Sequence, residues 1–247
     1  MVMVIVVPII IQNAFTQFVN MLDNIMVGQI GTLPMSAVSI SNQLLQVINL
    51  AIIGSVGAIG IFGAQFYGKK DMKGFTECIY IKLLAAAIFV SAGILIFFFK
   101  GRYMVSFYMD ETTNTAAEIT DTLNYAETYI RIMIIGLIPF GLSSAMSTIS
   151  REAGKTLINM YSGIVSVLVN FVLNYLLIFG HFGFPEMGVA GAAVATVISR
   201  FVELFVVMFG LWHDRESFPF LPELAGKFHI SGDLLKRSII KGDASDY

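Results

Sequence analysis

Charged residues are scarce in this chain of 247 residues, where Asp, Glu, Lys and Arg together make up 13%. Soluble domains carry about 25%. The chain has one cysteine, Cys78, and three histidines, so no intramolecular disulfide can form and no Cys/His cluster is evident. The sequence also lacks a phosphate-binding glycine loop and a G-x-S-x-G motif. We therefore expect neither an enzyme nor a nucleic-acid-binding protein.

Apolar residues are abundant instead, at 56% of the chain with a mean hydropathy of +0.78. They gather in long stretches without charge, at 24–68, 83–99, 132–150 and 156–185. A membrane-spanning helix needs about 20 mostly apolar residues. We therefore predict an all-α integral membrane protein with six transmembrane helices at about 1–27, 36–66, 75–99, 123–148, 157–180 and 188–212.

Basic residues are distributed unevenly between the two sets of loops. The connections near 68–74 and 149–156 and the tail from 213 hold ten Lys and Arg, whereas the opposite loops hold only Lys100 and Arg102. Loops rich in Lys and Arg stay in the cytoplasm, which places both termini there. We interpret 213–247 as a cytoplasmic connector in which residues 231–241 form an amphipathic surface helix.

Polar side chains form one stripe along the first predicted helix. Offsets of 3, 4, 7 and 11 residues bring them to one face, and a lipid-facing helix would not carry them. We expect this face to line a polar interior. The stripe consists of Gln12, Asn13, Thr16, Gln17, Asn20, Asp23 and Asn24.

Asp23 is the sharpest feature of that stripe, because it is the only acidic residue among the first 70 and no basic residue lies near it in sequence. A carboxylate removed from water and left without a counter-charge favours its protonated form or a bound cation. The competing interpretation is an ordinary interfacial carboxylate, since Gly28 and Gly31 mark the end of the helix just beyond it.

Other spans repeat the polar pattern. Asn42 and Gln46 on the second helix extend the predicted cavity, and Asn170 and Asn174 lie one turn apart on the fifth. Amide oxygens are suitable ligands for a hard cation, and Thr196 on the sixth helix can add a hydroxyl. The alternative for the two asparagines is hydrogen bonding between helices.

Two acid–base pairs and two prolines also fall inside the predicted spans. Glu127 precedes Arg131 by four residues, and Glu203 follows Arg200 by three, so each pair is expected to neutralise itself. The alternative is that Arg200 or Glu203 lines a transport path. Pro8 and Pro139 each remove a backbone hydrogen bond and are candidate hinges.

Five segments together resemble the MATE (multidrug and toxic compound extrusion) family of transporters, in order and in spacing. They are Pro8–Asn13, Asn20–Gly31, Gln65–Asp71, Asn170–Asn174 and Gly188–Thr196.

This resemblance implies one lobe of a twelve-helix transporter that exports cationic or amphipathic compounds in exchange for Na⁺ or H⁺ by alternating access. Asp23 corresponds to the first-helix carboxylate linked to the coupling cation, with Asn170, Asn174 and Thr196 beside it. Asn174 replaces an Asp of the family pattern. No cofactor is implied beyond the coupling ion, which as Na⁺ would sit at Asp23, Asn170 and Asn174. The implied location is a bacterial inner membrane.

The resemblance covers only the first half of such a transporter, so we expect an amino-terminal lobe whose partner is the missing carboxy-terminal lobe or a second copy of itself. Two other functions stay open. One is a non-transporting or regulatory half-transporter. The other is a flippase for lipid-linked saccharides from the same superfamily.

Overall fold

The computed structural model describes residues 10–11, 14, 17–18, 21–109 and 115–214. Within these residues the fold is helical. Residues 21–28 form the described end of the first helix, and five long helices and one short 3₁₀ turn follow. They are α2 (Thr32–Gly68), α3 (Met72–Ser106), α4 (Ala116–Glu152), α5 (Thr156–Phe179), η1 (His181–Gly183) and α6 (Gly188–His213).

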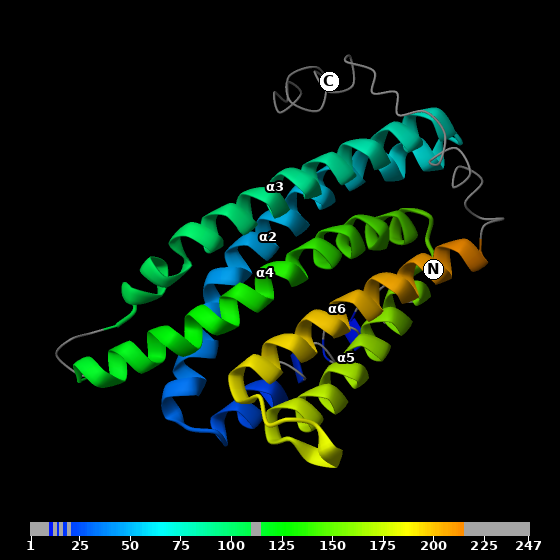
Figure 1. Ribbon diagram of the computed structural model, residues 1–247. Helices are drawn as coiled ribbons and strands as arrows, with labels where there is room; N and C mark the ends of the chain where they lie inside the picture. The colour runs from blue at the N-terminus through cyan, green and yellow to red at the C-terminus, as the bar shows by residue number, and fades with distance from the viewer. Residues whose placement is uncertain (1–9, 12–13, 15–16, 19–20, 110–114, 215–247) are drawn as a thin grey trace.

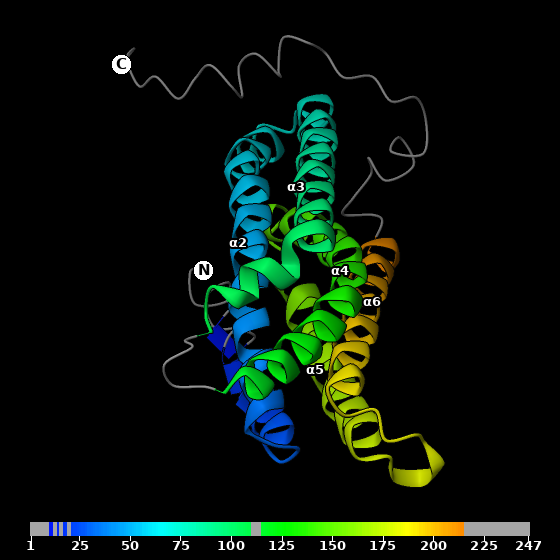
Figure 2. The same ribbon diagram turned by 60° about the vertical axis from the view of Figure 1, so that its left-hand side comes forward.

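Helix α4 lies at the centre of the bundle (Figure 1). It packs against α2 and α3 on one side and against α6 on the other, and α5 packs chiefly on α6. Helix α3 contacts α2 and α4 and lies at the edge of the bundle, away from α5 (Figure 2). This arrangement leaves the outer face of α3 without a helical neighbour among the described residues.

Local signals account for several helix ends. Asp71 caps α3 by accepting a hydrogen bond from the backbone N–H of Gly74. Thr115 and Glu118 form a reciprocal capping box at the start of α4, which satisfies backbone donors that the first turn leaves free. Helix α5 stops at Gly180, whose φ of 70° is readily adopted by glycine.

Helices α2, α3 and α4 are longer than the sequence predicts. Helix α3 begins three residues before the predicted 75 and continues seven beyond 99, and α4 begins at 116 rather than 123. The predicted boundaries followed the charged residues, but a helix need not stop where the hydrocarbon layer stops. The stretch 100–122, expected to be a loop, is therefore helical at 100–106 and 116–122.

Five of the described helices are long and apolar enough to cross a membrane. Large apolar side chains such as Phe98, Phe99 and Phe205 point outward, as expected for a lipid-facing surface. Small residues allow α6 to approach α5 closely. A Cβ at Gly191 would lie 2.5 Å from the carbonyl oxygen of Leu177, so only glycine fits at this crossing.

Several predictions fall on residues outside the described ranges. These are the hinge at Pro8, the cavity residues Asn13 and Asn20, and the amphipathic helix at 231–241.

Candidate functional site

A polar cavity of about 430 Å³ opens between the first helix, α2, α4 and α6. Of the residues expected to face a substrate cavity, Asn42 and Gln46 line this one and Gln17 does not. Polar side chains predominate in its wall, which is formed by Asp23, Asn24, Ser39, Asn42, Gln43, Leu45, Gln46, Asn49, Tyr129, Met133, Thr196 and Arg200. A cavity of this size and polarity can hold a small solute together with water.

Asp23 lies where this cavity meets α5. The Nδ2 of Asn174 donates a hydrogen bond to Oδ1 of Asp23 and lies 3.1 Å from Oδ1 of Asn170. The Nδ2 of Asn170 lies 3.3 Å from the hydroxyl of Thr196. The fold therefore brings together the four residues predicted to bind the coupling cation.

The amide of Asn170 is in conflict with one neighbour whichever way it is turned. The atom assigned as its oxygen lies 2.9 Å and 3.2 Å from the two carboxylate oxygens of Asp23. If this atom is oxygen, it accepts from Asn174 but faces the carboxylate. If it is nitrogen, it donates to Asp23 but faces the amide nitrogen of Asn174. Turning the amide lets its nitrogen donate to both carboxylate oxygens of Asp23, whereas a proton or cation between Asp23 and Asn170 would satisfy the oxygens with the amide as assigned.

A second oxygen at this site is also unsatisfied. The Oδ1 of Asn174 is buried and has no hydrogen-bond partner within the described part of the chain, which is unfavourable for a carbonyl oxygen away from water. One carboxylate and two amides can supply hard oxygen ligands for an alkali or alkaline-earth cation once the Asn174 amide turns its oxygen toward Asp23. The residues present therefore fit either a proton or Na⁺.

Tyr129 and Arg200 line the same cavity. The hydroxyl of Tyr129 donates to Oδ1 of Asn42 at 3.0 Å and so links α4 to α2. The guanidinium of Arg200 donates to the carbonyl of Gly136 at 3.2 Å and lies 4.9 Å from the ring centre of Phe140. Tyr129 was not among the predicted site residues, because its resemblance to a helix-four tyrosine of the MATE family rests on too loose a local pattern.

The two predicted ion pairs have different outcomes. Arg131 and Glu127 form an ion pair of 2.6 Å, but Arg102 on α3 shares the same carboxylate at 2.7 Å. Arg200 and Glu203 form no close ion pair within the described residues, and the guanidinium of Arg200 donates to the carbonyl of Gly136. A three-residue spacing on a helix permits contact but does not require it, and Arg200 turns toward α4 instead.

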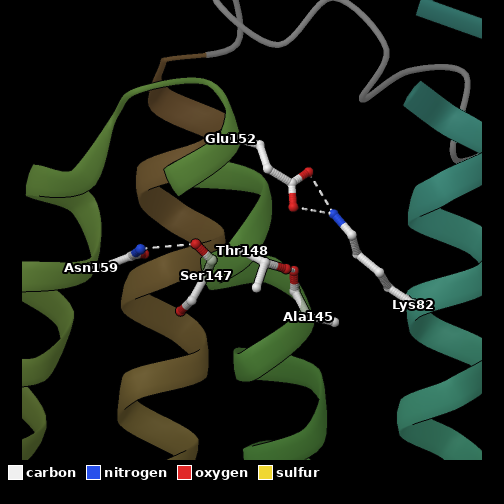
Figure 3. A network of polar contacts seen from close by, with 6 residues as sticks. All are labelled: Lys82, Ala145, Ser147, Thr148, Glu152 and Asn159. Carbon is white, nitrogen blue, oxygen red and sulfur yellow. Dashed lines mark hydrogen bonds and ion pairs between the residues drawn. The ribbon is translucent and has the colours of Figure 1, made fainter. Parts of the chain in front are cut away.

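Lys82 and Glu152 form a buried ion pair that sequence reasoning missed (Figure 3). The ammonium of Lys82 on α3 lies 2.5 Å from both carboxylate oxygens of Glu152 at the end of α4. Nearby, the side-chain amide of Asn159 on α5 donates to the carbonyl of Ser147 at 2.8 Å. These contacts join α3, α4 and α5 at the end of the bundle opposite η1. The sequence did contain an indication of this ion pair, because Lys82 and Glu152 lie at or near the ends of the two uncharged stretches 83–99 and 132–150.

Pro139, the second predicted hinge, is buried within α4, which continues helical on both sides of it. Its ring removes one backbone hydrogen bond at the centre of the bundle.

Comparison with known proteins agrees with this architecture. The family model described as MatE matches residues 8–176. A protein named "Probable multidrug resistance protein NorM" from Bacillus licheniformis is 27% identical over 209 residues, which cover 82% of this chain and 44% of that protein. A protein of the same name from Thermotoga maritima is 28% identical over 219 residues, covering 85% and 44%.

Solved structures share the fold. The structure titled "Crystal structure of MATE in complex with MaD3S" superimposes with a TM-score of 0.77 and covers 96% of this chain and 50% of that one, at 18% identity. The chain thus spans about half the length of the relatives it matches. These observations define a multi-pass membrane protein with the transporter fold of one MATE lobe. The chain belongs to the MatE family.

Proposed function

We propose that this chain is the amino-terminal lobe of a multidrug efflux antiporter, which exports cationic or amphipathic compounds in exchange for Na⁺ or H⁺. The relatives' name, multidrug resistance protein, supports the substrate class. The single observation that carries the coupling role is the grouping of the Asp23 carboxylate with the amide of Asn174, whose buried Oδ1 has no hydrogen-bond partner within the described residues, beside a polar cavity. A bound proton or Na⁺ supplies the donor or the positive charge that this group of oxygens lacks.

In this mechanism the coupling cation and the substrate compete for the charge of Asp23. With Asp23 ionised, its carboxylate attracts a cationic substrate into the cavity. When Na⁺ or H⁺ enters from outside and binds Asp23, Asn170 and Asn174, the cavity loses its negative charge and the substrate is released. The ion shifts the lobe between conformations only by its difference in affinity for them, and Pro139 offers a point at which α4 can bend.

The whole transporter in this proposal has twelve helices in two lobes, and both termini of this lobe lie in the cytoplasm of a bacterial cell. The second lobe is supplied by another polypeptide segment or by a second copy of this chain, in an assembly related by pseudo-symmetry.

Dye export tests the proposal. The chain is expressed in cells stripped of efflux pumps and loaded with a fluorescent cationic dye, beside Asp23→Asn and the control Asp121→Asn, which removes an exposed carboxylate on α4. We expect export that Asp23→Asn abolishes and Asp121→Asn retains. Full ion-coupled export by Asp23→Asn contradicts the coupling role. No export by any variant found in the membrane favours the non-transporting half.

Purified protein provides an independent test. Na⁺ bound to the native state should raise the unfolding temperature, by an amount set by its concentration relative to its Kd. K⁺ at the same ionic strength is the control, and Asp23→Asn should remove the response to Na⁺. An H⁺-coupled lobe gives no response to Na⁺ but a pH-dependent unfolding temperature that Asp23→Asn abolishes.

One observation favours a second function. Arg200 places a positive charge in the cavity wall, which suits a lipid-linked saccharide with an anionic phosphate group. Uptake of a labelled anionic lipid carrier into vesicles distinguishes this flippase activity from dye export.

A further inference from the structure

Three charged side chains form a cluster where α3 and α4 approach the 106–116 connection. Arg102 on α3 lies 2.7 Å from one carboxylate oxygen of Glu127, and Arg131 lies 2.6 Å from the other. Arg102 also donates to Oδ1 of Asn124 at 2.9 Å. Because one carboxylate serves two guanidinium groups, the cluster has one excess positive charge.

The cluster lies at the level where the hydrocarbon layer should end. The uncharged stretches 83–99 of α3 and 132–150 of α4 measure roughly 26 and 28 Å at 1.5 Å per residue, close to the hydrocarbon thickness of a bilayer. Arg131 directly adjoins the second stretch, and Arg102 lies three residues beyond the first. By this measure both guanidinium groups are at headgroup depth, and the hydrocarbon-spanning part of α4 begins after Arg131 rather than at the predicted residue 123.

Exposed cationic side chains and exposed aromatic side chains lie next to each other at the cluster. We call the aromatic pair, Phe98 and Phe99, the aromatic shelf. The side chains of Arg131 and Arg102 are 70% and 45% exposed, and Phe98 and Phe99 beside them are 65% and 72% exposed. A depression of about 220 Å³ is lined by Phe97, Phe98, Phe99, Arg102, Glu127, Ile130 and Arg131. It lies between α3 and α4, and α3 packs chiefly on α2 and α4.

At the opposite end of α3 and α4, a buried ion pair joins the two helices without any outward-facing charge, and it serves as a comparison. There, one base and one acid, Lys82 and Glu152, join α3 to α4, with side chains 0% and 6% exposed. The outer cluster adds a second guanidinium that faces outward. Each guanidinium has five N–H donors in a planar fork that matches phosphate oxygens. Within the described residues, Arg131 uses only Nη2, toward Glu127.

We propose that Arg102 and Arg131 bind the phosphodiester of an anionic phospholipid, with Phe98 and Phe99 contacting its acyl chains. The headgroup supplies the negative charge that the cluster lacks, and the aromatic shelf keeps the lipid at the edge of α3. Such a lipid holds α3 against α4 on the face that no helix of the described residues covers.

Lipid titration of purified, delipidated protein in detergent tests this site, with native mass spectrometry as the readout. Phosphatidylglycerol is compared with phosphatidylcholine, and inorganic phosphate is added as a competitor. We expect phosphatidylglycerol to bind about fivefold more tightly than phosphatidylcholine, the change that corresponds to about 1 kcal/mol for one cation near an anionic headgroup. Displacement by inorganic phosphate alone would assign the site to free phosphate and overturn the lipid proposal.

Three variants separate binding from structure. Arg131→Gln should weaken phosphatidylglycerol binding about fivefold, and the control Lys100→Gln should not, because Lys100 lies over the ring of Tyr103 instead. Glu127→Gln should strengthen binding, because it raises the excess positive charge although it breaks both ion pairs. If Glu127→Gln weakens lipid binding, or if Arg131→Gln and Lys100→Gln behave alike, the cluster is only a structural link and the proposal is wrong.

Discussion

The ammonium of Lys82 lies 2.5 Å from both carboxylate oxygens of Glu152, and both side chains are almost wholly removed from solvent. Such a pair is weak evidence for net stability, because desolvating two charges offsets much of their attraction. Removing one partner is a different matter, because it leaves a buried charge without compensation.

Lys82→Met should therefore destabilise the bundle by about 3–5 kcal/mol, seen as a lower unfolding temperature in detergent. The double variant Lys82→Met with Glu152→Leu should recover most of this loss, since neither charge remains. Lys155→Met is the matched control. Lys155 pairs with Asp214 at 2.8 Å in a partly exposed position, where loss of a pair changes stability by less than about 1 kcal/mol. A double variant as unstable as the single one would contradict this account.

The same pair depends on two glycines of α2. A Cβ at Gly60 would lie 2.7 Å from one carboxylate oxygen of Glu152, and a Cβ at Gly63 would collide with the other. Because Lys82 holds that carboxylate in place, Gly63→Ala should separate α2 from α4 and lower the unfolding temperature. Gly57→Ala is the control, since nothing lies within 4 Å of its added Cβ. It should raise helix stability by about 0.5–1 kcal/mol. Equal effects of the two substitutions would mean that the carboxylate moves aside freely.

The sequence predicts the spans well and their cross-links poorly, for one physical reason. A membrane span is a local property of about 20 consecutive residues. The uncharged stretches mark α2 to α5 directly, and α6, which contains Arg200 and Glu203, is marked by its mainly apolar composition. The contact between Lys82 and Glu152 joins residues 70 positions apart. It depends on how α3 and α4 pack and on the small residues of α2, which periodicity alone does not determine. Asp23 was singled out by its isolation in an apolar helix, but its grouping with Asn170 and Asn174 was indicated only by the family resemblance.

Asn174→Asp tests the electrostatics of the proposed cation site. It places a second carboxylate against Asp23, and two ionised carboxylates in contact repel each other. We expect a lower unfolding temperature at pH 8 in K⁺ buffer, and recovery at pH 6 or in Na⁺, because either cation neutralises the pair. The swap Asp23→Asn with Asn174→Asp restores one carboxylate and one amide and should recover stability at pH 8. A variant that is indifferent to pH and Na⁺ would show that the two side chains do not share a site.

Arg200 determines how the cavity discriminates substrates by charge, if the proposed efflux function holds. Its guanidinium is held by the carbonyl of Gly136 and the ring of Phe140, while Asp23 lines the same cavity. Arg200→Gln should strengthen binding of a cationic rhodamine ester about fivefold and weaken binding of the parent rhodamine, which carries a free carboxylate. The interaction involved is about 1 kcal/mol for unit charges in a partly hydrated cavity. Fluorescence polarisation with purified protein measures both affinities. Arg200→Lys keeps the charge but loses the planar guanidinium over Phe140, so it should leave the ratio of the two affinities within about twofold of its original value. If Arg200→Gln weakens both dyes equally, Arg200 acts through packing against Phe140, and the cavity selects its substrates without using this charge.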